Sequence, residues 1–67
     1  MRTAQQAAEK PMQDDKWKPE SGKVRRVMMA HGNYVDWEIE GTRMMYCSKL
    51  TMFRRWFQTA TFLGGSE

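Results

Sequence analysis

Residues 24–40, VRRVMMAHGNYVDWEIE, decide the expected fold. The first part, residues 24–31, is an apolar and basic run rich in β-forming residues. Gly32-Asn33 follows, and this pair is typical of a two-residue type II′ turn in which glycine takes a positive φ. Residues 34–40 then alternate between apolar and acidic side chains, which is the pattern of a half-buried strand. The stretch therefore predicts an antiparallel β-hairpin.

The length of the turn sets the register of this hairpin. With a two-residue loop, Trp37 faces Met28 on one side of the sheet, and Arg25 meets Glu40 on the other. A three-residue loop would instead turn Val27 inward, because a shift of one residue exchanges the two faces of a strand. We favour the two-residue loop, since it brings Arg25 and Glu40 together as an ion pair.

A third strand and a helix are expected after the hairpin. Gly41 marks a second two-residue turn, formed with either of its neighbours, and leads to a short strand over residues 42–47. Under both choices Tyr46 joins the Trp37 face. Ser48 is a suitable N-cap, and apolar residues then recur at helical spacing until Gly64-Gly65 ends the helix. The apolar positions of this helix are Leu50, Phe53, Phe57 and Ala60.

These elements predict an α+β fold. It consists of a three-stranded antiparallel β-meander followed by one C-terminal α-helix, which packs on one face of the sheet. Residues 23–63 form this domain, and residues 64–67 form a C-terminal tail. Residues 1–22 are polar and predict a flexible N-terminal arm, with at most a short helix before Pro11. Trp17 is the exception in the arm: it either anchors the arm to the domain or contacts a partner.

The small size of the domain suggests that it works in contact with another molecule. Domains of about 40 residues are hard to stabilise without disulfides, metal or association. One cysteine and one histidine among 67 residues exclude an internal disulfide and do not fill a structural zinc site. One helix covers one sheet face, so Val27, Met29 and Met45 stay on the other face, and an outer strand keeps an unpaired edge. We therefore expect a homodimer, a protein target, or both.

Catalysis is not expected. In the predicted register Cys47 and His31 lie about two strand spacings (~10 Å) apart, which is too far for proton transfer. The acidic side chains of residues 36–40 are typical of a row of solvent-exposed carboxylates on one strand face. The sequence has no phosphate-binding loop, nucleotide-binding glycine pattern or serine elbow. We expect no enzyme activity, no metal, no cofactor and no small-molecule substrate.

The charge distribution leaves nucleic-acid binding as an alternative. The net charge is +3, and residues 1–22 are balanced, so the excess lies in the C-terminal two-thirds of the chain. A field of this kind attracts nucleic acid or an acidic protein surface. The basic residues that would form a nucleic-acid interface are Lys49, Arg54, Arg55, Lys23 and Arg25.

Protein binding is the favoured function. Methionine either fills a loose small core or forms an adaptable contact surface, and tryptophan and arginine dominate interface energetics. The candidate protein-binding residues are Trp56, Phe62, Met29, Met45 and Trp17. In length and general composition the chain resembles small accessory proteins encoded by phages or mobile elements. This resemblance implies an inhibitor or regulator of a larger host protein. The N-terminal sequence lacks a secretory signal, and no apolar run is long enough to cross a membrane, so we expect a cytoplasmic location.

Overall fold

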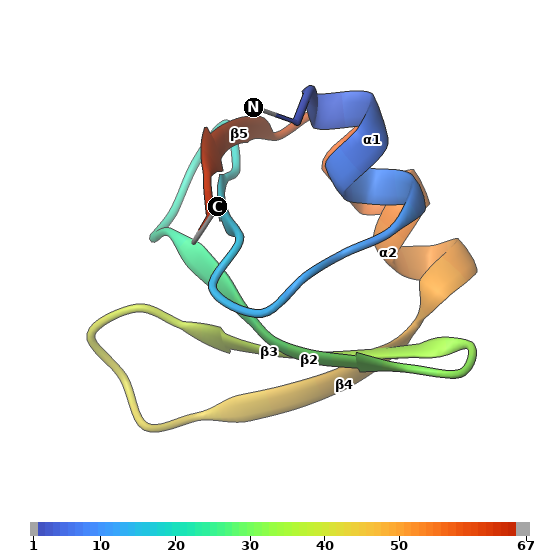
Figure 1. Cartoon of the computed structure of the whole chain (residues 1–67). Helices are drawn as coiled ribbons and strands as arrows, with labels where there is room; N and C mark the ends of the chain where they lie inside the picture. Colours follow the sequence, from blue (N-terminus) through green and yellow to red (C-terminus); the bar gives the residue numbers. More distant parts are fainter. Residues whose placement is uncertain (1, 66–67) are drawn as a thin grey trace.

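The computed structural model describes residues 2–65 and has an α+β architecture with an antiparallel sheet. Five strands follow one another in the spatial order β4-β3-β2-β1-β5, and two short helices pack beside them (Figure 1). The elements are α1 (Ala4–Glu9), β1 (Lys16–Lys18), β2 (Arg25–His31), β3 (Tyr34–Ile39), β4 (Met45–Lys49), α2 (Leu50–Phe57) and β5 (Thr61–Gly64).

The α+β class and the antiparallel sheet are confirmed, but the predicted number of elements is wrong. The sheet has five strands instead of three, and one of the two helices lies near the N-terminus. Residues 4–18, predicted to belong to a flexible arm, supply α1 and β1. The indole of Trp17 is 1% exposed and packs among core side chains, so Trp17 takes the anchor position rather than a surface position.

Helix α1 begins with a reciprocal cap. The Thr3 hydroxyl accepts a hydrogen bond from the Gln6 N–H (3.2 Å), and the Gln6 side chain accepts one from the Thr3 N–H (2.9 Å). This capping box satisfies two N–H groups that a helix start leaves free. Ala7 and Ala8 are buried between α1 and its neighbours. Tertiary packing is needed here, because an isolated helix of this length is marginal in water.

The predicted β2–β3 turn is confirmed. His31 pairs with Tyr34, so the loop has two residues, and Gly32 has a φ of 59°. The predicted register holds as far as Met29 opposite Asp36, and then a β-bulge at Met28 shifts it. Val27, not Met28, therefore lies opposite Trp37 and is buried, so its predicted place on the uncovered face is wrong.

The predicted ion pair between Arg25 and Glu40 is wrong for the same reason. Beyond the bulge, Arg25 lies opposite Ile39. Its guanidinium stacks on aromatic rings, and Glu40 pairs with Lys16 instead (3.3 Å). An extra residue on one strand moves every later partner by one position, and an alternating pattern does not reveal it.

The third strand of the predicted meander is β4, shifted along the chain from residues 42–47 to Met45–Lys49. Trp37 pairs with Tyr46 and Asp36 with Cys47, which is the register that the Gly41-Thr42 turn predicts. The Glu40-Gly41 alternative differs from it by two residues, so Tyr46 lies on the Trp37 face as predicted under both choices. The ring centroids of Trp37 and Tyr46 are 4.5 Å apart in a stacked arrangement.

Helix α2 is shorter than predicted at both ends. Its N-cap is Lys49, whose side chain has no acceptor to cap the helix. The Ser48 hydroxyl lies one residue earlier and accepts a hydrogen bond from the Trp37 indole N–H (3.0 Å). The helix ends at Phe57, and residues 61–64 form β5 instead of continuing it. Gly64 has a φ of 101° within the end of that strand, so it does not act as the helix stop.

The core lies between the two helices and a bent sheet (Figure 1). Strand β2 spans the bend, since its first residues pair with β1 and its whole length pairs with β3. Trp17 occupies the centre, with its ring centroid 4.7 Å from that of Phe57 and 4.8 Å from that of Phe62. Residues 4–18, which include α1 and β1, are thus part of the packing that positions the β2–β4 surface.

Candidate functional site

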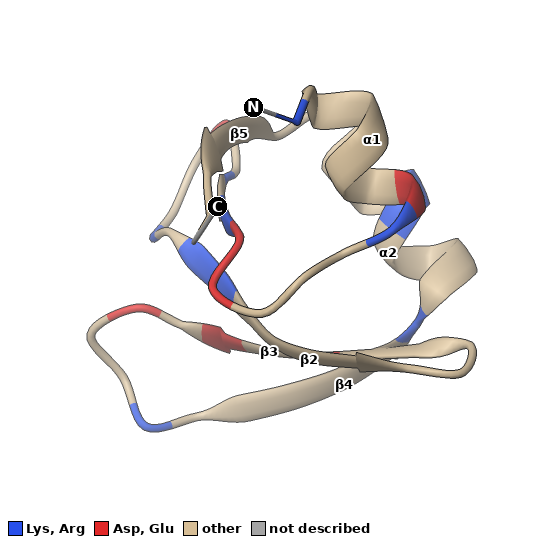
Figure 2. Ribbon diagram, viewed as in Figure 1, with Lys and Arg blue, Asp and Glu red and all other residues tan. Residues whose placement is uncertain are grey.

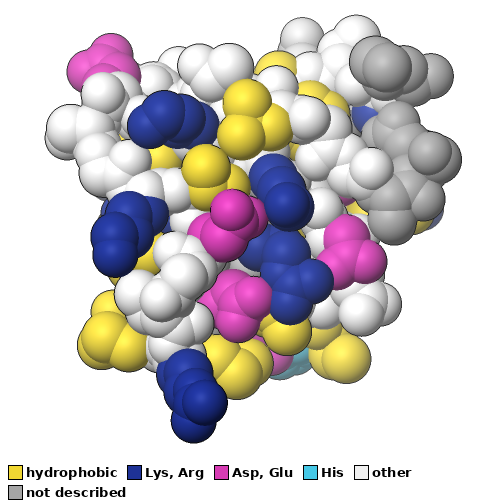
Figure 3. Space-filling view, turned by 90° about the vertical axis from the view of Figure 1, so that its left-hand side faces the viewer, with side chains coloured by type: hydrophobic (Ala, Val, Ile, Leu, Met, Phe, Trp, Pro, Cys, Tyr) yellow, Lys and Arg dark blue, Asp and Glu magenta, His cyan; other side chains and the backbone are white. Residues whose placement is uncertain are grey.

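The outer face of strands β2–β4 points away from the helices and the core. Register places Met29, Asp36 and Cys47 side by side in one row, and Arg26, Glu38 and Met45 in the next. Met29 is 58% exposed and Met45 is 61% exposed. In Figure 3 apolar side chains lie along the lower part of the molecule, charged side chains of both signs lie above them, and one basic side chain projects below them. This outer face therefore carries large apolar side chains in water.

The charges on this face are largely paired. Arg26 donates to Glu38 (Nε–Oε1 2.9 Å) and to Asp14 (Nη1–Oδ1 2.7 Å). The hydrogen bond to Glu38, the larger effect, and the two nearby negative charges raise the pKa of Arg26. Strand β4 itself carries no acid, and its one basic residue is Lys49 at its C-terminal end (Figure 2). The methionines thus lie beside neutralised charges.

Strand β4 forms one edge of the sheet, because β3 is its only partner strand among residues 2–65. The Leu50 N–H donates to the Asn33 carbonyl (2.6 Å). In an antiparallel ladder, bonded and non-bonded pairs alternate. The N–H groups of Met45, Cys47 and Lys49 therefore point to the free edge. Such an edge is a template for pairing with another strand.

Of the predicted protein-binding residues, only the two methionines are exposed. Met29 and Met45 lie on the outer face, whereas Trp17 is buried and Phe62 is half-buried against it. Trp56 is half-buried beside Phe53, with ring centroids 6.1 Å apart. The structure therefore separates the two methionines from the three aromatic residues.

Arg25 lies between two tryptophan rings. Its guanidinium carbon is 4.6 Å from the Trp37 ring centroid and 4.3 Å from that of Trp56. Trp37 stacks in turn on Tyr46, so the rings and the guanidinium form a continuous stack from β4 to α2. Partial burial is the main cause that lowers the pKa of Arg25. Cation–π contacts of this kind stabilise the helix on the sheet.

The predicted basic interface is dispersed. Arg54 donates to the carbonyl oxygens of Glu9 (2.8 Å) and Ala8 (3.4 Å), so it closes the end of α1. Lys23, Lys49 and Arg55 are exposed, on the loop before β2, at the end of β4 and on α2. The structure does not bring these five cations into one patch.

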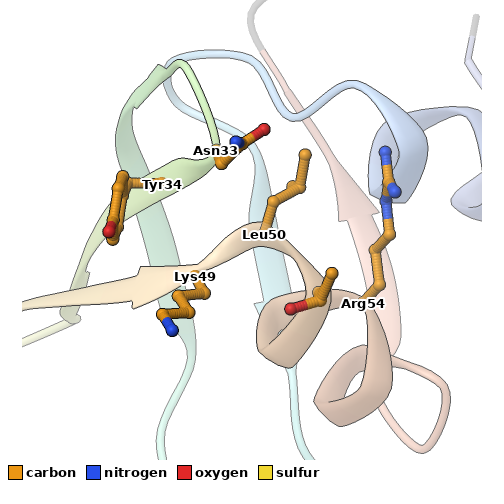
Figure 4. A pocket seen from close by; sticks show the side chains of 6 residues that line it. Asn33, Tyr34, Lys49, Leu50 and Arg54 are labelled. Carbon is orange, nitrogen blue, oxygen red and sulfur yellow. The ribbon is translucent and has the colours of Figure 1, made fainter.

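An open hollow of about 450 Å³ lies where β4 runs into α2. Figure 4 shows Lys49 and Tyr34 on one side of it and Arg54 on the other, with Leu50 between them. Asn33 and Thr51 complete the lining. Two cations and one aromatic ring thus border the same hollow.

A cluster that sequence reasoning missed lies on the outer face. The His31 Nε2 and Asp36 Oδ2 atoms are 3.0 Å apart, and Asp36 also forms a hydrogen bond with Cys47. The sequence predicted about two strand spacings between Cys47 and His31, because the Glu40-Gly41 turn places Tyr34 opposite both. In the observed register, which is that of the Gly41-Thr42 turn, Asp36 lies opposite Cys47 and bridges the two.

Hydrogen bonding within the cluster shifts two pKa values. The bond from Cys47, followed by that from His31, lowers the pKa of Asp36. The bond to Asp36 is the main cause that raises the pKa of the Cys47 thiol. A raised thiol pKa lowers the fraction of thiolate, which is the nucleophilic form of cysteine.

Comparison with protein-family models, curated proteins and solved structures gives no match. Within residues 2–65, neither α1 nor α2 is long and apolar enough to cross a membrane.

Proposed function

We propose that this chain is a non-enzymatic protein-binding module, and that its β4 edge pairs with the β4 edge of a second copy. The observation that carries the proposal is the unpaired edge of β4, flanked by the exposed side chain of Met45. Regulation of a host protein, as predicted from the sequence, would be a task of the resulting dimer.

The free groups of β4 are self-complementary. They belong to Met45, Cys47 and Lys49, which lie symmetrically about Cys47. In a two-fold antiparallel pair, Cys47 lies opposite its own copy and Met45 opposite the copy's Lys49. The N–H of Lys49 then donates to the copy's Met45 carbonyl. This arrangement joins two sheets edge to edge, which is a common mode of strand addition.

The composition of the edge favours a protein partner of this kind. Natural edge strands are often protected by inward charges, prolines or bulges. Strand β4 has one charge, at Lys49, and neither proline nor a bulge in its pairing with β3. Met44, which precedes it, is 58% exposed. Pairing of two β4 strands removes Met44 and Met45 from water and gives the free N–H and C=O groups of the edge hydrogen-bond partners.

A non-enzymatic role is supported by the state of the only thiol. Cys47 donates its proton toward Asp36 rather than toward His31, and this raises the thiol pKa. A nucleophilic cysteine needs the reverse, an adjacent base that removes the proton.

Replacing Lys49 by proline tests the proposal sharply. Lys49 has a φ of −64° and a ψ of 144°, which a proline adopts without strain. Lys49→Pro deletes one free N–H in each copy and leaves the β3 ladder intact. Lys49→Ala is the matched control, because it removes the same side chain and keeps the N–H.

Sedimentation equilibrium is the assay, with circular dichroism to establish that each variant is folded. Loss of one hydrogen bond per copy, at about 0.5–1.5 kcal/mol each, weakens the dimer roughly 5–150-fold. We expect Lys49→Ala to dimerise like the parent protein and Lys49→Pro to be weakened by that factor. A folded monomer of the parent protein at high micromolar concentration, or equal dimerisation of both variants, contradicts the proposal.

The hollow between β4 and α2 supports a second candidate, nucleic-acid binding. Lys49 can contact a phosphate there while Tyr34, which is 44% exposed, stacks on a base. Affinity for a generic single strand should then fall steeply with salt, and Lys49→Ala should reduce the salt slope by about 1. Absence of binding to DNA and RNA at low salt eliminates this candidate.

A further inference from the structure

Three different donor atoms lie together on the outer face. They are His31 Nε2, an Asp36 carboxylate oxygen and Cys47 Sγ, and all lie within 4.8 Å of one another. The shortest of these separations that involves histidine is 3.0 Å, to Asp36 Oδ2. Each residue is at least partly exposed, so an ion can reach the cluster from solvent.

Three adjacent strands hold these donors. Asp36 lies on the central strand β3, directly opposite Cys47 on β4. On the other side Asp36 lies opposite Met29, and His31 is two residues further along β2, on the same face. The ring of Tyr34 stacks on that of His31, with a centroid separation of 6.2 Å and an interplanar angle of 23°. Paired strands and this ring contact thus restrict the donors to one place.

We propose that His31, Asp36 and Cys47 bind one Zn²⁺ ion per chain. Zinc accepts imidazole nitrogen, carboxylate oxygen and thiolate sulfur at about 2.0–2.3 Å. Donors at such distances from one ion lie within about 4 Å of one another, so small side-chain rotations close the cluster around it. A carboxylate and a thiolate also match the two positive charges of the ion.

The ion changes the hydrogen bonding of the cluster. Cys47 binds as the thiolate, so its proton passes to the solvent when the metal binds. The contacts from Asp36 to His31 and Cys47 are replaced by bonds to the metal. Three protein donors leave at least one position of a tetrahedral ion for water or an added ligand, which distinguishes this site from a closed structural one.

This inference does not depend on the pairing of β4. All three donors belong to one chain, and Lys49 is not among them. Lys49→Pro therefore separates the two proposals: it weakens the dimer and should leave zinc binding unchanged. If that variant loses both, the site requires the second copy, and the single-chain site is wrong.

The test uses the full chain, with Zn²⁺ and Co²⁺ as probes. Zinc affinity is measured by competition with a chromophoric chelator, and Co²⁺ loading is followed by its thiolate charge-transfer absorption. We expect one ion per chain and a charge-transfer band that disappears in Cys47→Ser. Asp36→Asn and His31→Gln should each weaken zinc binding by more than about tenfold, the lower limit for loss of even an outer-shell partner.

Glu40→Gln is the matched control for Asp36→Asn. Glu40 is an exposed carboxylate just after β3, and its partner is Lys16. It should bind zinc like the parent protein. No band with Co²⁺ in the parent protein, or equal zinc affinity in Cys47→Ser and the parent, overturns the proposal even if other variants fail to fold.

Discussion

Replacement of Trp17 by alanine tests whether the N-terminal residues are part of the fold. Trp17 lies in a strand of three residues, yet its side chain is buried at the centre of the core. Its ring contacts those of Phe53, Phe57 and Phe62 at centroid distances of 6.2, 4.7 and 4.8 Å. Helix α2 and strand β5 therefore both depend on this one side chain.

The expected loss is a large fraction of the total stability. A buried tryptophan removes about 150–250 Å² from water, and tryptophan-to-alanine changes in a core cost about 3–5 kcal/mol. A chain of 67 residues has a free energy of unfolding of about 3–10 kcal/mol. Trp17→Ala should therefore unfold the chain or leave it only marginally folded, which urea denaturation followed by circular dichroism measures.

Two further variants sharpen this test. The Trp17 indole N–H is buried without a hydrogen-bond partner among the described residues. Trp17→Phe removes that donor, whose burial costs about 1–3 kcal/mol, so its net loss should stay below about 2 kcal/mol. Met12→Ala, at an exposed position of the same segment, should change stability by less than about 0.5 kcal/mol. A loss below about 1 kcal/mol in Trp17→Ala would show that residues 1–22 do behave as an arm.

Three further outcomes are expected. Ser48→Ala removes the acceptor of the Trp37 indole N–H, and the free energy of unfolding should fall by about 1–2 kcal/mol in urea titrations. Arg54→Gln removes a cation from the carbonyl end of α1, and thermal unfolding should show a loss of about 0.5–1.5 kcal/mol; an unchanged midpoint would refute either reasoning. The pKa of Asp36 is lower in the folded chain, so its contribution to stability is present above its ordinary pKa of 3.8 and is lost as the pH falls through the folded value. The loss of stability at acid pH should be smaller in Asp36→Asn than in the parent protein when melting temperature is measured against pH. Equal losses in the variant and the parent would contradict this prediction.

The sequence predicted the elements whose signals are local. Alternation over residues 34–39 and the Gly32-Asn33 turn are enough to define the β2–β3 hairpin. Tyr46 was placed on the correct face because the two predicted turns differ by two residues, and the observed register is that of the Gly41-Thr42 turn. The apolar spacing after Lys49 predicted α2 as far as Phe57.

The missed elements depend on contacts between distant residues. Strand β1 has only Trp17 as an apolar signal, and it forms because β2 and β5 pair with it. Residues 61–64 continue an apolar helical pattern, yet they pair with β1 as a strand. Tertiary pairing overrides local preference in both cases.

The candidate site was predicted only in part. The exposure of Met29 and Met45 followed from the number of faces that one helix can cover. The cluster of His31, Asp36 and Cys47 was missed because its geometry depends on the position of the second turn. The predicted separation rested on the Glu40-Gly41 turn, whereas the Gly41-Thr42 turn, the other predicted choice, gives the observed pairing of Asp36 with Cys47. An error of two residues in strand register leaves each side chain on the correct face of the sheet but places it beside the wrong residue of the neighbouring strand.

Amide hydrogen exchange at the β4 edge tests the central claim most directly. The N–H groups of Met45, Cys47 and Lys49 point away from β3, and those of Tyr46 and Ser48 point toward it. If two copies pair through β4, the first three should exchange fast in dilute solution and become protected as protein concentration rises, while the other two stay protected throughout. Fast exchange of Met45, Cys47 and Lys49 at every concentration, in a sample that sediments as a dimer, would contradict the account.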